Sequence, residues 1–346
     1  MKPAADDDDS TIKLKRPQAL LASRARTRPS LASWGFAAAG VVVVAGGGVA
    51  GWVLWPRPPV PVVANRAVAV ALSPVPRPKE FAIETATEAQ IRGNTPIGMT
   101  IFRLAENRDV LVLDFASLHE QGSMLNRLGA FAEKAGIPHD RVLTDPELDQ
   151  AIRRGGDTPE TFYYGHDYSA STIARFFALA DRDHIALNPH EEALRRLMLQ
   201  EDWRAGGKAA GLISVPRAGA DARVTDDARA TILHHELSHG EYFSNPAYAA
   251  YTHRFWTTVL TQQERDAVRR YLVTEDYDPA LEDLIENEAQ AYLVFTYNPV
   301  FFAPSLVGMT EARRAELRTI FLRDVPEAWM RDSVLPQSAI AKAAAH

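Results

Sequence analysis

Cysteine is absent from this chain of 346 residues. Its absence excludes thiolate metal ligands, a cysteine nucleophile and a disulfide framework. Basic residues are also in deficit, because 38 Lys and Arg stand against 44 Asp and Glu, a net charge of -6. This balance, acidic throughout the part after Pro56, gives no support for nucleic-acid binding. The hydrophobic content of 46% is sufficient for a globular core.

Charge is absent from one long stretch near the N-terminus. Residues 34–55 contain no Asp, Glu, Lys or Arg, and they are long enough to cross a hydrocarbon core of about 30 Å. Trp34 and Trp55 at its two ends suit the interfacial positions that indole rings prefer. Residues 1–33, with the acidic run Asp6–Asp9 followed by scattered basic residues, are typical of a disordered tail. We expect residues 34–55 to form a single transmembrane helix.

Basic residues are more frequent before this segment than after it. This asymmetry predicts a cytoplasmic N-terminus and an extracytoplasmic main domain, which is periplasmic if the cell is bacterial. A cleaved signal peptide is the alternative, but the apolar run is too long and the first cleavage-like site, Ala67–Ala69, lies well beyond it. Residues 56–79 are rich in proline and predict an extended linker.

The remaining sequence predicts an α+β fold that is predominantly helical with a small sheet. Strands are expected at 99–104, 110–115 and 212–215. Capping residues and apolar spacing predict helices at 118–134, 145–154, 170–179, from 189, around 226–239, and at 248–260, 262–272 and 281–295. We expect an α/β N-terminal subdomain at 80–220 and a helical subdomain with a zinc site at 221–340.

The zinc site is predicted from one short pattern, His235-Glu236-x-x-His239. On a helix, residues four apart share a face, so the two imidazoles can bind one Zn²⁺ ion. Glu236 lies about 100° round the helix, where its carboxylate can act as general base on a water molecule at the metal. Thr225 is a suitable N-cap for this helix. A chance match on a solvated helix is the alternative, and His234 is expected to flank the site.

A zinc site needs a third ligand, and without cysteine this must be His, Asp or Glu. In the predicted helix 281–295, Glu288 lies in the middle of an apolar stripe, where a charge is costly unless a cation pairs with it. A metal ion is such a partner. An arginine partner or a protonated carboxyl group is the alternative. Glu286 points about 160° away from Glu288 and is expected to be solvated.

Together the two motifs resemble those of the gluzincins, the thermolysin-like zinc peptidases. In that group the third ligand is a Glu, often preceded by Asn, on a helix that follows the first motif. The corresponding residues here are Asn287 and Glu288. The resemblance covers these motifs alone. It implies His235, His239 and Glu288 as zinc ligands and Glu236 as general base.

Some parts of the expected site are not assigned by the resemblance. The position four residues after the ligand Glu, commonly Asp in that group, is Tyr292 here. Tyr292, Tyr297 and His253 are candidates for stabilising an oxyanion, by proximity in sequence. The aromatic stretch Phe162–Tyr168 is either a substrate contact or a loop anchor. The strand at 212–215 is a candidate for pairing with an extended substrate.

The sequence therefore predicts a membrane-anchored zinc metallopeptidase, a hydrolase that cleaves polypeptides outside the cytoplasm with Glu236 as general base. The alternative is a membrane-tethered binding or assembly protein with a structural or inactive zinc site. A fourth protein ligand, His166 or His253, would favour that alternative because structural zinc sites keep no open position. A zinc hydrolase acting on a non-peptide amide or ester is a third candidate.

Overall fold

The computed structural model describes residues 80–204 and 207–332. The expected tail at 1–33, transmembrane helix at 34–55 and linker at 56–79 lie outside these residues. Within the described part, no helix combines the length and the apolar character that crossing a membrane requires. All the described residues belong to one structural unit.

The strands form one mixed sheet. β1 (Glu84–Ala86), β2 (Thr100–Leu104), β3 (Val110–Phe115), β4 (His166–Ser169) and β5 (Gly211–Pro216) lie in the order β1-β2-β3-β5-β4. β1 is parallel to β2 and β3 is parallel to β5, whereas the β2–β3 and β4–β5 pairs are antiparallel. β4 is therefore an edge strand of the described sheet and β5 lies inside it. The expected α+β class, rich in helix and with a small sheet, is confirmed.

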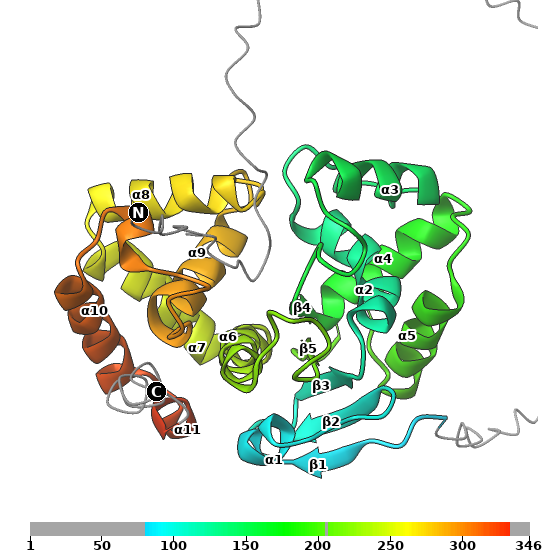
Figure 1. Ribbon diagram of the computed structural model, residues 1–346, viewed down its shortest axis with the longest axis horizontal. Helices are drawn as coiled ribbons and strands as arrows, with labels where there is room; N and C mark the ends of the chain where they lie inside the picture. Colours follow the sequence, from blue (N-terminus) through cyan, green and yellow to red (C-terminus); the bar gives the residue numbers. More distant parts are fainter. Residues whose placement is uncertain (1–79, 205–206, 333–346) are drawn as a thin grey trace, which may run out of the picture. The chain divides into compact units, whose positions relative to one another are not determined.

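Helices cover both faces of this sheet (Figure 1). Side chains alternate along β3, so that Leu111 and Leu113 pack on one face and Val110 and Val112 on the other. The first face is covered by α2 (Leu118–Glu133), α4 (Ala170–Arg182) and α5 (Pro189–Gln200), with α3 (Asp145–Arg154) beside α2. The second face is covered by α6 (Asp226–Ser244), the helix that carries the His-Glu-x-x-His pattern.

α6 is enclosed on its other sides by further helices (Figure 1). These are α1 (Glu88–Arg92), α7 (Pro246–Arg254), the π-helical turn η1 (Phe255–Val259), α8 (Gln262–Thr274), α9 (Glu282–Gln290), the π-helical turn η2 (Ala291–Phe295), the 3-10 turn η3 (Pro304–Val307), α10 (Glu311–Asp324) and α11 (Ala328–Asp332). Every residue of α6 from Ala228 to Glu241 is buried. Polar side chains in this stretch therefore need partners within the protein.

The start and the depth of α6 follow from local chemistry. Thr225 caps the helix as predicted, because its hydroxyl oxygen accepts a hydrogen bond from the amide of Ala228 at 3.1 Å. Gly240 allows the helix to lie close to the sheet, since a Cβ atom there would come within 2.9 Å of Cγ1 of Val110. The two features fix where the helix begins and how near its C-terminal half lies to β3.

Most elements begin or end within a few residues of the sequence-based expectation. β3 and α3 have the predicted bounds, and α2, α5 and α8 differ from them by at most two residues. Two expectations were wrong. Residues 166–169 are the edge strand β4, although they were assigned to a loop. The strand at 212–215, seen as β5, is paired on both sides with β3 and β4, so an added peptide strand cannot pair with it.

One buried ion pair connects α6 to the sheet. The guanidinium group of Arg229 donates to both carboxylate oxygens of Asp114 on β3, at 2.8 and 2.9 Å. Its remaining hydrogen bonds go to the carbonyl oxygens of Ile91, Arg92 and Pro216. Arg229 therefore joins α1, β3, β5 and α6 at one point.

Replacing Arg229 by Met should destabilise the protein strongly, because the Asp114 carboxylate would stay buried after losing its cation. Removing one partner of a buried pair typically costs about 3–5 kcal/mol. Urea unfolding of the full-length chain, followed by tryptophan fluorescence, measures this loss. Arg323→Met is the matched control, because Arg323 pairs with Asp324 at the exposed surface. Equal unfolding midpoints for the two variants would contradict the assigned role.

Candidate metal centre

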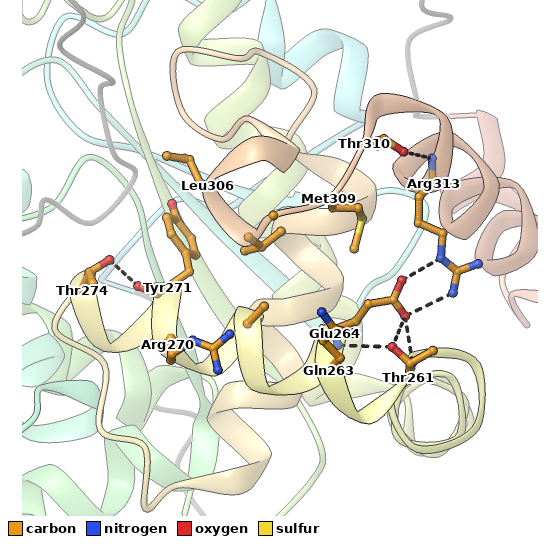
Figure 2. A pocket seen from close by; sticks show the side chains of 13 residues that line it. Thr261, Gln263, Glu264, Arg270, Tyr271, Thr274, Leu306, Met309, Thr310 and Arg313 are labelled. Carbon is orange, nitrogen blue, oxygen red and sulfur yellow. Dashed lines mark hydrogen bonds and ion pairs between the residues drawn. The ribbon is translucent and has the colours of Figure 1, made fainter.

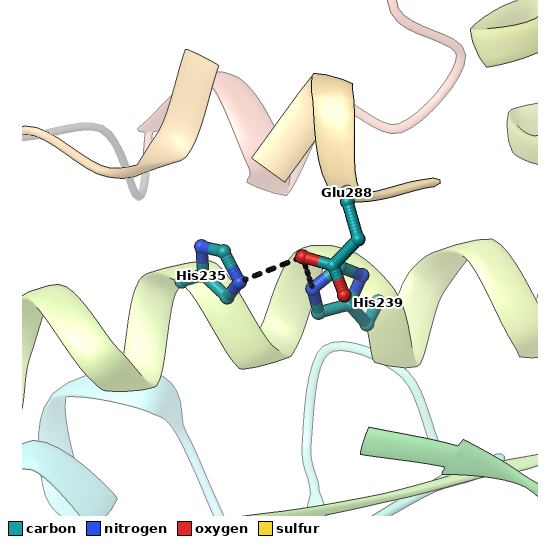
Figure 3. A group of neighbouring side chains, drawn as sticks. All are labelled: His235, His239 and Glu288. Atoms are coloured by element: carbon teal, nitrogen blue, oxygen red, sulfur yellow. Dashed lines mark ion pairs between the residues drawn. The ribbon is translucent and has the colours of Figure 1, made fainter. Parts of the chain in front are cut away.

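His235 and His239 project from one side of α6, and Glu288 reaches them from α9 (Figure 3). The two imidazole rings are 4.7 Å apart between centroids. The Nε2 atoms of His235 and His239 lie 3.6 and 3.7 Å from Oε2 of Glu288. All three side chains are fully buried. The structure therefore brings together the three residues that the sequence analysis selected as ligands.

The spacing of these three atoms suits a zinc ion. Zinc binds imidazole nitrogen and carboxylate oxygen at about 2.0–2.2 Å, so neighbouring donors in a tetrahedral site are about 3.4 Å apart. The observed separations of 3.6 and 3.7 Å are close to that value. Two nitrogen donors and one carboxylate also match the ligand set of zinc sites that keep one open position. The residues present therefore fit a zinc ion.

The hydroxyl of Thr296 determines which nitrogen of His235 carries the proton. This hydroxyl donates to the carbonyl of Ala291 at 3.0 Å, so its oxygen accepts the 2.8 Å hydrogen bond from Nδ1 of His235. Nδ1 is then protonated, and Nε2 presents its lone pair beside Glu288. Thr296 is itself held by Arg314, whose guanidinium group binds its carbonyl oxygen. A hydrogen bond of this kind orients a metal-binding histidine.

Asp167 faces His239 from the edge strand. It pairs with Ile213 in the register of β4 and β5, and therefore lies on the face of the sheet that α6 covers. Its Oδ1 atom is 3.8 Å from Nδ1 of His239. Both ring nitrogens of His239 are buried without a hydrogen bond to the described residues. A carboxylate on one side and Glu288 on the other thus flank a ring whose two nitrogens are available.

Tyrosine side chains surround the other side of the group. The ring of Tyr292 lies edge-on to that of His235, with centroids 4.8 Å apart. Tyr277, in the connection between α8 and α9, is completely enclosed. Burial raises the pKa of Tyr277 well above its usual value, and the nearby charge of Glu288 and a hydrogen bond to it act in the same direction. Its hydroxyl therefore stays protonated at neutral pH and is a hydrogen-bond donor.

Glu236 lies on the flank of this group, against the backbone of Gly165. A Cβ atom at position 165 would overlap Oε1 of Glu236 and would come within 2.7 Å of its Cδ atom. Glycine is therefore required for the carboxylate to occupy its place. Glu236 also forms a second group of buried donor atoms with Asp167 and His239, all within 4.8 Å of one another. The candidate base is thus adjacent to the candidate ligands.

The remaining histidines lie elsewhere. Nε2 of His234 is 3.1 Å from Glu88 on α1, which agrees with a flanking role. His166 points to the opposite face of the sheet from Asp167 and contacts Ser214 at 3.0 Å. His253 is largely exposed and contacts Glu286 at 2.9 Å. Neither histidine proposed as a fourth ligand belongs to a metal-binding group among the described residues.

The expectation that Glu286 is solvated was wrong. Its side chain is buried because α7 covers that face of α9, and His253 on α7 binds it. Burial raises the pKa of Glu286, while the hydrogen bond with His253 acts in the opposite direction. Tyr297, an oxyanion candidate from the sequence, packs against the ring of His234 at 5.7 Å, away from Glu288.

Two cavities differ in their relation to the centre. The largest, about 650 Å³, lies between α8 and the segment from η3 to α10, where Arg313 binds Glu264 (Figure 2). None of the candidate ligands lines it. A smaller cavity of about 180 Å³ is lined by Asp167 on β4 and by Asn287, next to Glu288. The smaller cavity therefore adjoins the candidate metal centre.

Four supporting residues were missed by the sequence analysis, namely Gly165, Asp167, Tyr277 and Thr296. Asp167 belonged to the aromatic stretch singled out as a possible substrate contact, but strand alternation was not applied to it. If that alternation had been recognised, one of His166 and Asp167 would have been assigned to the α6 face. The other three have no motif, and only the three-dimensional packing identifies them.

Comparison with known proteins adds no assignment. No protein-family model, curated protein or solved structure matches this chain. The chemical argument therefore depends on the geometry of the described residues.

His239→Ala should abolish stoichiometric zinc binding, whereas His234→Ala should retain it. The two residues are on the same helix and both are buried, but only His239 faces Glu288. Zinc content after dialysis, measured by mass spectrometry on the full-length chain, distinguishes them. Equal zinc content in both variants would exclude the assigned ligand set.

Thr296→Val should weaken zinc binding by about 10–100-fold, because the partner that orients His235 would be lost while the side-chain volume is kept. Competition with a chromogenic chelator measures the affinity. Thr319→Val, at an exposed position on α10, is the control and should bind zinc like the unchanged chain. An unchanged affinity for Thr296→Val would show that the hydroxyl does not orient the ring.

Proposed function

We propose that the chain is a zinc-dependent metallopeptidase of the gluzincin type, with its main domain outside the cytoplasm and anchored by residues 34–55. The observation that carries this proposal is the convergence of His235, His239 and Glu288 on one buried point, with donor atoms 3.6 and 3.7 Å apart. A zinc ion bound there would supply a Lewis acid that polarises a carbonyl group and makes a water molecule more acidic.

The side chains around this point have distinct roles in the proposed reaction. Glu236 takes the proton of the attacking water and passes it to the amine that leaves. Gly165 leaves the space that the Glu236 carboxylate occupies. Thr296 and Asp167 face the outer nitrogens of His235 and His239 and orient the two rings.

Tyr277 is the best supported donor to an oxyanion. Its contact with Glu288 places its hydroxyl at the centre, and its raised pKa keeps the proton on that hydroxyl. A protonated donor at this position can stabilise the negative charge that develops on a carbonyl oxygen. Tyr292 is a second candidate because it packs against His235, whereas Tyr297 and His253 contact residues outside the centre.

A polypeptide substrate is supported by the edge strand β4. An extended peptide can add to the edge of a sheet through main-chain hydrogen bonds. β4 is an edge of the described sheet, and Asp167 on this strand faces the ligand His239. A peptide paired with β4 would therefore pass beside the metal centre. This takes the place of the pairing with residues 212–215 expected from the sequence.

The alternative of a structural zinc site has less support. Such a site needs a fourth protein ligand, and His166 and His253 contact Ser214 and Glu286 instead. Catalytic zinc sites use three protein ligands and keep one position open. Three donors that converge, with a carboxylate beside them, therefore favour the catalytic arrangement.

Glu236→Gln should reduce cleavage of an unfolded protein substrate by at least about 100-fold, because the amide cannot accept the proton. Zinc content should not change, since Glu236 is not a proposed ligand. The matched control is Glu286→Gln on α9, which should cleave at the rate of the unchanged chain. Equal cleavage by the Glu236→Gln variant and the unchanged chain would refute the assignment of the base.

Gly165→Ala should also lower the cleavage rate while the zinc content stays constant. The added methyl group overlaps the Glu236 carboxylate and displaces it from its place beside the centre. Gly98→Ala is the control, because a Cβ atom there meets no atom within 4 Å. Cleavage rate and zinc content are measured on the same preparations. A Gly165→Ala variant that cleaves normally would exclude a requirement for this position of the base.

A further inference from the structure

The segment that follows α2 joins the two sets of helices on either side of α6. We call residues 133–139 the strap. The carbonyl of Glu133 accepts a hydrogen bond from the amide of Asp278 at 2.9 Å. The amide of Ala135 donates to the carbonyl of Asp276 at 3.0 Å. These two bonds form an isolated antiparallel bridge with the connection between α8 and α9.

Side chains add to this main-chain pairing. Nζ of Lys134 is 3.5 Å from Asp276, and Nε2 of His139 is 3.1 Å from Asp278. The Lys134 ammonium group also lies over the ring of Phe162, 4.8 Å from its centroid. The strap is thus bound both to the helical part beyond α6 and to the segment that leads into β4.

The strap also closes the cavity that adjoins the metal centre. Glu133 and His139 from the strap line this cavity together with Asp167 and Asn287. Its volume is about 180 Å³. Ligand pockets usually measure about 300–1,000 Å³, and one water molecule accounts for about 30 Å³ of liquid volume. The closed cavity holds several water molecules but has no room for an extended peptide.

We infer that the strap is a gate over the metal centre, which opens to admit a polypeptide to β4 and closes after it. This inference rests on the proposed function. The contacts of the strap are two main-chain hydrogen bonds and two partly exposed ion pairs, whereas α6 beneath it is buried along its length. Local opening of so few contacts is far less costly than unfolding the core. Substrates that fit such a gate are unfolded or flexible chain segments.

Tyr277 connects the gate to the chemistry. It lies opposite Lys134 in the bridge, and its hydroxyl contacts Glu288. When the bridge separates, the connection that carries Tyr277 is released from the strap, and closure returns the hydroxyl to the centre. Opening therefore admits substrate, and closure completes the set of side chains around it.

A disulfide across the bridge tests this inference, because the chain has no other cysteine. Ala135 and Asp276 lie opposite each other, and opposed residues of an antiparallel pair have Cα atoms about 4.5–5.5 Å apart, within the disulfide range. The full-length Ala135→Cys and Asp276→Cys double variant is compared in its oxidised form and after reduction by a phosphine. Each single variant under oxidising conditions is the matched control.

Two measurements are made on the same samples. Oxidation should lower cleavage of an unfolded protein by at least about tenfold without changing zinc content, and reduction should restore it. Hydrogen exchange should show strap amides exchanging much faster than those of α6 in the reduced form, and much more slowly once oxidised. The exchange measurement requires no enzymatic activity.

The results separate the gate from the proposed function. Equal cleavage by the oxidised and reduced forms would overturn the gate. Strap amides that exchange as slowly as those of α6 in the reduced form would also overturn it. A reduced protein and a Glu236→Gln variant that both fail to cleave would refute the peptidase proposal on which the gate depends, even if the strap amides exchange rapidly.

Discussion

Burial of several carboxylates at one place is the constraint on which this structure depends. Asp167, Glu236 and Glu288 come from three different elements, and all three are buried around His239. Concentrating negative charge away from water is costly, and the cost falls when a cation lies among the acids. The enclosure of α6 between the sheet and the later helices produces this burial. The same packing that forms the core therefore also creates the demand for a metal ion.

The supporting contacts come from parts of the chain that are distant in sequence. Thr296 follows the second motif, Asp167 belongs to the edge strand, and Gly165 precedes that strand. In the resembled family an Asp four residues after the ligand Glu commonly orients a histidine. Here that position is Tyr292, and Asp167 and Thr296 face the outer nitrogens instead. Similar chemistry can thus be supported by different side chains when the local packing differs.

Sequence reasoning was most reliable where the signal is local. Helix α5 was placed by the capping residue Asn188, and the selection of Glu288 followed from its position on an apolar stripe. It failed where another element decides the environment. Glu286 points away from Glu288 on its own helix, but α7 covers that side, which a single helix cannot reveal. The strand β4 was missed because His166 and Asp167 are both polar, so neither face shows the usual apolar alternation.

The π-helical turn η2 has a consequence for how this chain can change in length. In this turn the amide of Thr296 donates to the carbonyl of Ala291, five residues earlier, so the turn accommodates one residue more than an α-helix would. Deleting a residue there would rotate everything that follows by about 100° relative to α9. The hydroxyl beside His235 would then point elsewhere. The number of residues between the second motif and Thr296 is consequently under stricter constraint than their identities.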